Sequence, residues 1–116
     1  MNVVRQDRAP TYSAPGHVAM TLRRLQGREA GPSDTAWIGL SVIQPGGGTT
    51  LADSPVEKFY VVLEGEVEIT AKFGDATQTA TLHRLDSCRL APGEARQLFN
   101  RTQQPASVLL VMPTLP

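Results

Sequence analysis

The chain has 116 residues, with 11 Lys and Arg against 11 Asp and Glu, so its formal net charge is zero when His is neutral. This length suits one domain with a modest core, and the balanced charge argues against a partner such as nucleic acid or an anionic membrane. The single cysteine, Cys88, excludes an internal disulfide bond and is consistent with a reducing compartment. Met1–Pro10 lacks the apolar segment of a signal peptide, and no apolar run approaches the roughly 20 residues that span a bilayer, so we expect a cytoplasmic protein.

The first part of the chain predicts an extended arm followed by two strands. Met1–Ala14 is punctuated by proline and polar residues and is typical of an arm. From His17 a period of two begins, which places Val18, Met20 and Leu22 on one face of a strand. The loop-like sequence QGREAGPSD follows at 26–34, and a second strand is expected at Thr35–Ile43. Its two faces would hold Ala36, Ile38, Leu40 and Val42 on one side and Trp37, Gly39 and Ser41 on the other.

The stretch Pro45–Glu66, PGGGTTLADSPVEKFYVVLEGE, organises the rest of the chain. We expect it to open on a glycine-rich turn, to contain a buried strand at Phe59–Leu63 and to close on a turn at Glu64-Gly65. Five further strands are predicted, at Val67–Phe73, Thr77–His83, Cys88–Leu90, Arg96–Asn100 and Ala106–Met112. No helical periodicity is sustained, so the pattern predicts a β-sandwich or a β-barrel.

Two segments resemble the motifs of the cupin superfamily, which read G-x5-H-x-H-x3-4-E-x6-G and G-x5-P-x-G-x2-H-x3-N. The tail of the first motif is VLEGE at 62–66, and the second corresponds to LDSCRLAPGEARQLFN at 85–100, with Gly65, Gly93 and Asn100 in register. The resemblance covers about Trp37–Met112. It implies an all-β fold, the cupin-type double-stranded β-helix or jelly-roll barrel, with 35–113 as the barrel domain. Residues 1–34 would form an arm and first strand that pack on the barrel or on the partner subunit of a homodimer.

The metal-ligand positions of these motifs are occupied by other residue types. The glutamate position holds Lys58, and the histidine of the second motif is replaced by Arg96. The two histidine positions of the first motif fall on Leu51 and Asp53, or on Ala52 and Ser54 in the shorter spacing. Charged Lys and Arg have no lone pair to offer a metal. We therefore expect no metal ion and no other cofactor.

The same positions predict a different kind of pocket. The resemblance implies that Asp53, Lys58 and Arg96 share a small volume, and Tyr60 follows Lys58 on the same strand face. Two cations and one anion favour a small carboxylate or another oxyanion as ligand. Lys58, desolvated beside an arginine, would have a lowered pKa and is the candidate catalytic base or amine nucleophile. The alternative is that Lys58 and Arg96 form structural ion pairs with Asp53, Glu57 or Glu94.

Three other side chains carry groups that can bind a ligand or act as a nucleophile. His17 lies on a strand that borders the pocket or the partner subunit in cupins, so it is a candidate binding residue or an interface histidine. His83 is expected at a solvated strand end, and Cys88 as a small buried residue rather than a nucleophile.

Two function classes remain open at this point. One is a metal-independent cupin that binds, and in a catalytic version transforms, a small anionic metabolite. The other is a dimeric sensing or interaction module whose barrel is closed by side chains. A pocket larger than roughly 300 Å³ that exposes Lys58 and Arg96 would favour the first class. A third reading is a metal cupin that uses an unusual ligand such as His17.

Overall fold

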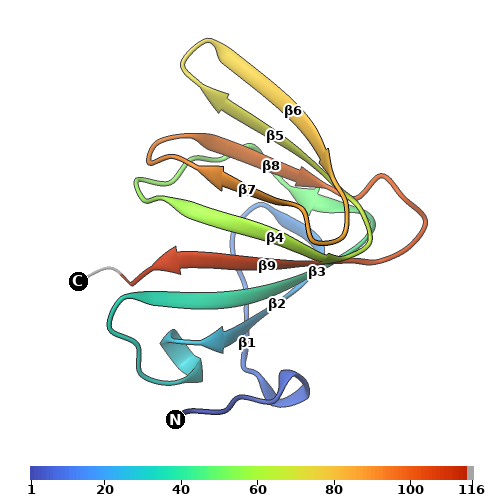
Figure 1. The fold of residues 1–116 in the computed structure, drawn as a ribbon. Helices are drawn as coiled ribbons and strands as arrows, with labels where there is room; N and C mark the ends of the chain where they lie inside the picture. Colours follow the sequence, from blue (N-terminus) through green and yellow to red (C-terminus); the bar gives the residue numbers. More distant parts are fainter. Residues whose placement is uncertain (115–116) are drawn as a thin grey trace.

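The computed structural model describes residues 1–114 and confirms the all-β prediction. Nine strands form one antiparallel sheet that curls into a barrel (Figure 1). They are β1 (Thr11–Tyr12), β2 (His17–Gln26), β3 (Ala36–Thr49), β4 (Lys58–Glu64), β5 (Val67–Phe73), β6 (Ala76–Leu82), β7 (Ser87–Leu90), β8 (Ala95–Phe99) and β9 (Ala106–Pro113). Two 3₁₀ helices, η1 (Gln6–Arg8) and η2 (Arg28–Ala30), flank β1 and β2. No helix in the described part of the chain is long and apolar enough to cross a membrane.

The strand order explains how the sheet closes on itself. It runs β6-β5-β8-β3-β9-β4-β7, with β2 also paired to β3. In Figure 1, β5, β6 and β8 lie on the side of the molecule opposite to β1 and β2. The long strand β3 joins the two sides, because its first half pairs with β9 and its end pairs with β8 through Gly48 and Phe99.

The prediction of a glycine-rich turn at Pro45–Gly48 is wrong, because β3 continues through these residues to Thr49. Gly46 adopts a φ of 78°, which bends the strand. The Gly46 N–H donates to the Asn100 carbonyl at 2.8 Å, and the Asn100 N–H donates to the Gly47 carbonyl at 2.9 Å. A Cβ atom at Gly48 would lie 2.1 Å from the Leu98 carbonyl oxygen, so glycine is needed for this close approach of two strands.

Two predictions for the N-terminal region also need correction. Part of the expected arm is strand β1, because Thr11 and Tyr12 pair with Arg23 and Leu22 of β2. In addition, Val18 does not share a face with Leu22. Ala19 has a φ of 54° and the register with β3 shifts between Val18 and Met20, so Val18 is 64% exposed whereas Leu22 is buried. A bulge of this kind breaks the period of two on which the prediction relied.

The barrel interior holds a single apolar core. Alternate residues of β4 point inward, so Lys58, Tyr60 and Val62 are buried while Phe59 is exposed. On β3 the inward face is the one that carries Trp37 and Ser41. The core cluster contains Trp37, Ile43, Tyr60, Val62, Val67, Ile69, Leu82, Leu90, Leu98, Ala106, Val108 and Leu110. The inward face of β4 therefore carries both core residues and the candidate catalytic lysine.

Gly65, the last residue of the first motif, turns the chain between β4 and β5. Its φ is 80°, and a Cβ atom there would lie 2.9 Å from the Pro105 carbonyl oxygen. We expect Gly65→Val to lower the free energy of unfolding by about 3 kcal/mol, because a β-branched side chain adds backbone strain to this clash. Urea unfolding measures the change. Gly74→Val is the control, since Gly74 has a φ of 59° but nothing within 4 Å of its Cβ position. Equal losses in the two variants would show that the contact with Pro105 has no effect.

Candidate functional site

A pocket of about 440 Å³ opens into the barrel beside the N-terminal segment. Its wall includes all of the candidate site residues of the sequence analysis, which are His17, Asp53, Lys58, Tyr60 and Arg96. They come from β2, from the connection between β3 and β4, from β4 itself and from β8. Whether they bind a ligand stays a prediction, but the topology brings them to one cavity of ligand-binding size.

Arg96 is held rigidly on the pocket wall. Its side chain is buried, and its Nε donates to the Tyr60 hydroxyl oxygen at 2.9 Å. Its Nη1 donates to the Thr49 hydroxyl at 3.2 Å and to the Thr50 carbonyl at 3.3 Å. Within residues 1–114, its Nη2 group makes no hydrogen bond and no carboxylate pairs with the guanidinium. The structure thus engages Nε and Nη1 of the guanidinium and leaves the Nη2 group without a described partner.

Lys58 is only 5% exposed, and its amine has no hydrogen bond or ion pair to any described residue. Its pKa is lowered to about 8, first by burial and second by the positive charge of Arg96, while Asp53 opposes the shift. This direction is the one expected from the sequence. The alternative, in which Lys58 and Arg96 form ion pairs with Asp53, Glu57 or Glu94, finds no such pair among the described residues. Glu57 pairs with Arg89, and Glu94 accepts the N–H of Ala91 at 3.0 Å.

Tyr60 connects Arg96 to the core. Its side chain is 2% exposed, and burial raises the pKa of its hydroxyl, with Arg96 acting in the opposite direction. The hydroxyl therefore remains protonated near neutral pH. Because its oxygen accepts from Arg96, its own proton can be donated to a ligand or a water molecule.

The two remaining candidates are less enclosed. Asp53 is exposed at the rim, and His17 is half-buried. A ring nitrogen of His17, Nδ1, lies 2.9 Å from the Pro15 carbonyl oxygen, which fixes the orientation of the imidazole. Both side chains are therefore less enclosed than those of Lys58, Tyr60 and Arg96.

Several wall residues were missed by the sequence analysis. The Arg24 guanidinium lies 3.4 Å from the centroid of the Tyr12 ring and 4.3 Å from that of Trp37, and its Nε lies 3.4 Å from Glu29. Trp37 packs in the core and also lines the pocket. Its Nε1 is buried without a hydrogen-bond acceptor in residues 1–114. No sequence pattern identifies this wall, because the pairing of β1 with β2 creates it.

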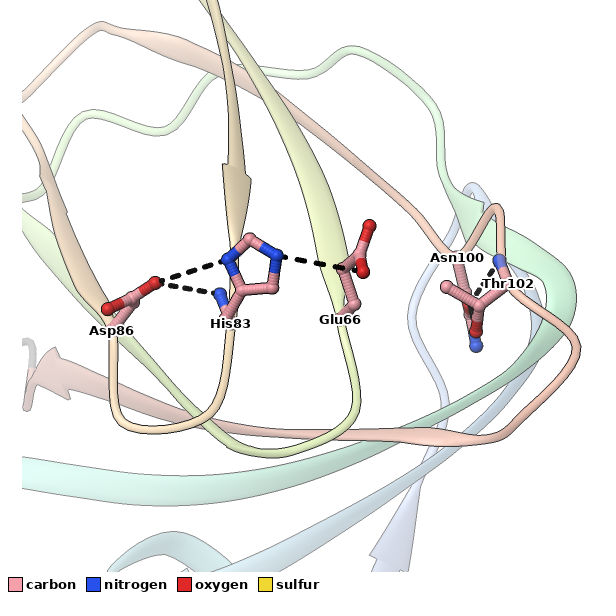
Figure 2. Close-up of polar contacts among 5 residues, drawn as sticks. All are labelled: Glu66, His83, Asp86, Asn100 and Thr102. Carbon is pink, nitrogen blue, oxygen red and sulfur yellow. Dashed lines mark hydrogen bonds and ion pairs between the residues drawn. The ribbon is translucent and has the colours of Figure 1, made fainter.

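Two residues outside the pocket, His83 and Cys88, have side chains that could bind a metal ion or act as a nucleophile. Figure 2 shows His83 between two carboxylates, with Glu66 and Asp86 each at 3.7 Å, and its side chain is 66% exposed as predicted for a strand end. Cys88 is half-buried, and burial raises the pKa of its thiol. Within the described residues no group of three or more His, Cys, Asp or Glu could hold a metal ion.

Comparison with known proteins gives the family. No protein-family model matches the sequence. The polyketide cyclase RemF from Streptomyces resistomycificus superposes with a TM-score of 0.80 at 21% identity, over 97% of this chain and 79% of its own. A sugar phosphate isomerase of the cupin superfamily, SPO2919 from Silicibacter pomeroyi, superposes with a TM-score of 0.77 at 22% identity, over 97% of this chain and 76% of its own. The chain has the cupin fold.

This cupin-fold chain also has a relative of much higher sequence similarity. The β-D-galactosidase Rv1717 from Mycobacterium tuberculosis is 44% identical over 112 residues, which cover 97% of this cupin and 93% of the mycobacterial protein. The two chains belong to one family. The solved structures are too distant in sequence to show more than the fold.

The metal centre that the superfamily motifs imply does not fit the residues of this cupin. Lys58 and Arg96 stand at two ligand positions and both face the pocket as cationic groups. Asp53 is the one carboxylate among the described pocket-lining residues. Nδ1 of the His17 imidazole is within hydrogen-bond distance of the Pro15 carbonyl oxygen. This donor set suits an anion better than a divalent cation.

Proposed function

We propose that this cupin binds a small anionic metabolite of the carboxylate type in the pocket, without a metal ion. The observation that carries the proposal is that Lys58 and Arg96 are both buried and both line one open pocket. No carboxylate pairs with either of them in the part of the chain that the structure describes. Buried like charges without a counter-ion are costly, so an anion that enters the pocket gains affinity from both.

The shape of the site favours a planar oxyanion. Arg96 is oriented by Tyr60, Thr49 and Thr50, and the Nη2 group of its guanidinium has no described partner. This Nη2 group and the amine of Lys58 can each donate to one oxygen atom of a carboxylate. The pocket of about 440 Å³ accommodates a small metabolite and argues against a barrel closed by side chains. The homodimer predicted from the sequence stays a prediction, which the native mass in solution would test.

The first test is a thermal-shift screen of the purified protein against small carboxylates, inorganic phosphate and divalent metals. Metal content is determined on the same sample. Stabilisation by a carboxylate in metal-free protein is the expected result, because a ligand that binds the native state raises its stability. A tightly bound metal ion, or no response to any anion, would contradict the proposal.

Arg96→Gln should weaken carboxylate binding by at least about tenfold, because a neutral amide replaces the charged fork. Isothermal titration with a carboxylate that stabilises the wild type measures the change. Some loss of stability is expected as well, about 1–3 kcal/mol, since the Tyr60 and Thr49 contacts of Arg96 are buried. The matched control is Arg101→Gln, because Arg101 is an exposed partner of Glu68 and lies outside the pocket. Equal affinity in the wild type and Arg96→Gln would place the anion elsewhere.

A second candidate function is the hydrolysis of β-D-galactosides, and the 44% identity to Rv1717 favours it. Glycoside hydrolysis usually requires two carboxyl groups that flank the scissile bond, roughly 5–9.5 Å apart. Among the described residues that line the pocket, Asp53 alone carries a carboxylate. An assay with an aryl β-D-galactopyranoside, repeated on Asp53→Asn, distinguishes the two functions. Hydrolysis that depends on Asp53 would support the galactosidase candidate, whereas the anion-binding proposal predicts none.

A further inference from the structure

We propose that Lys58 condenses with the carbonyl group of a 2-oxo acid to form a Schiff base, which makes 2-oxo acids the ligand class of this pocket. The inference rests on the proposed anion site and adds a covalent step to it. It assigns to Lys58 the role of an amine nucleophile and to Arg96 the role of a carboxylate holder.

The surroundings of Lys58 suit an attacking amine. An amine that donates to a carboxylate has its lone pair blocked by protonation, but Lys58 has no such partner among residues 1–114. Its backbone is fixed at the first residue of β4, where it pairs with Leu90. The side chain is 5% exposed and lines the pocket, so a ligand in the pocket would meet a largely desolvated amine. Its lowered pKa, about 8, leaves a useful fraction of neutral amine near pH 7.

The neighbouring groups select an acid whose carbonyl is next to its carboxylate. Arg96 lines the pocket, and its Nη2 group, which has no described partner, can donate to the carboxylate; its charge also acts on Lys58. In a 2-oxo acid the carbonyl carbon is directly bonded to the carboxylate carbon. An acid held by Arg96 therefore presents its electrophilic carbon close to the carboxylate site. The Tyr60 hydroxyl, which remains protonated, can donate to the carbonyl oxygen.

The chemical step balances without any other reactant. The lone pair of the neutral Lys58 amine attacks the carbonyl carbon, a C–N bond forms, and the electrons of the C=O π bond move to oxygen. The resulting carbinolamine loses that oxygen as water. Both protons of the water correspond to the two protons that the amine carried, and a C=N bond remains. No electrons are gained or lost until a reductant is added for trapping.

The chain is well suited to a trapping experiment because Lys58 and Lys72 are its only lysines. The protein is incubated with pyruvate or 2-oxoglutarate and sodium cyanoborohydride, and its intact mass is measured. We expect the mass of the acid minus one oxygen atom to be added once, and peptide mapping to locate it on Lys58. Mapping also separates this label from reaction at the N-terminal amine. Lys58→Arg should abolish the label, whereas the control variant Lys72→Arg should retain it, because Lys72 is exposed on β5.

A parallel measurement separates failure of the covalent step from failure of the anion site. Lactate has the carboxylate but no carbonyl, so it tests binding alone by thermal shift on the wild type and on Lys58→Arg. Stabilisation by lactate without any trapped 2-oxo acid would overturn the Schiff base and leave the anion site in place. No stabilisation and no trapping would overturn both. Equal labelling of Lys58 and Lys72 would show ordinary lysine reactivity and would also overturn the inference. A thermal unfolding transition of Lys58→Arg confirms that the variant is folded.

Discussion

Replacing Asn100 by alanine is expected to lower the free energy of unfolding by about 4 kcal/mol, as urea unfolding should show. Asn100 is fully buried, and its Nδ2 donates to the Ile43 carbonyl at 2.9 Å and to the Gln104 carbonyl at 2.7 Å. Its Oδ1 accepts from the N–H and the hydroxyl of Thr102, at 2.9 Å and 2.8 Å (Figure 2). Each bond contributes about 1 kcal/mol net, and truncation also leaves buried backbone groups without partners.

The exposed Asn2 provides the control for this substitution. Its Nδ2 makes longer contacts, 3.4 Å to Gln26 and 3.2 Å to Ala30, so Asn2→Ala should change the stability by less than about 1 kcal/mol. Similar losses in the two variants would mean that the four bonds of Asn100 add nothing to the fold. The asparagine that ends the second motif thus has a structural role. Its side chain bonds the loop after β8 to Ile43, the last residue of β3 that pairs with β9.

The positions of most strands followed from the sequence because their side chains alternate regularly. The strand predicted at Val67–Phe73 is β5 with the same bounds. The strand predicted at Ala106–Met112 is β9, which extends one residue further, to Pro113. Each of these strands has one face toward the buried core and one face away from it, and this arrangement produces a period of two in the sequence. The choice of a cupin barrel came from the motif residues Gly65, Gly93 and Asn100, since alternation alone does not specify strand order.

The errors lie where a local backbone feature breaks that period. The φ of 54° at Ala19 shifts the register of β2, and no residue type marks the shift, because alanine rarely adopts this conformation. The Pro45–Gly48 run was interpreted as a turn since its composition is typical of one. Its glycines instead allow β3 to pass close to β8, which is a tertiary requirement that composition does not reveal.

The candidate site was predictable only as far as the motif extends. Lys58 and Arg96 are far apart in the sequence, and the expectation that they share a pocket came from the positions they occupy in the cupin motifs. The aromatic wall of Tyr12 and Arg24 lies outside those motifs. It depends on the pairing of β1 with β2. Strand β1 has only two residues, which is too short to give a periodic signal.

Replacing Lys58 by methionine should stabilise the protein at neutral pH, by up to about 3 kcal/mol. The pKa of Lys58 is lowered from 10.5 to about 8, so the unfolded chain binds the proton more tightly than the folded one. The resulting penalty on the folded state is fully present below pH 8, where both states are charged, and it disappears as the pH rises toward 10.5. Urea unfolding of the two proteins at about pH 6.5 and pH 9.5 should therefore show a gain that shrinks with pH.

Lys72→Met serves as the control, because Lys72 is exposed and its replacement should change the stability by less than about 0.5 kcal/mol at either pH. Burial raises the pKa values of Tyr12 and Tyr60 as well, so each variant is compared with the wild type at the same pH to remove their contribution. A loss of stability in Lys58→Met at pH 6.5 would mean that the amine makes a favourable native contact. A gain would show that this cupin retains a costly buried lysine in its pocket. The fold itself gives no reason to retain that charge, whereas a ligand that needs it does.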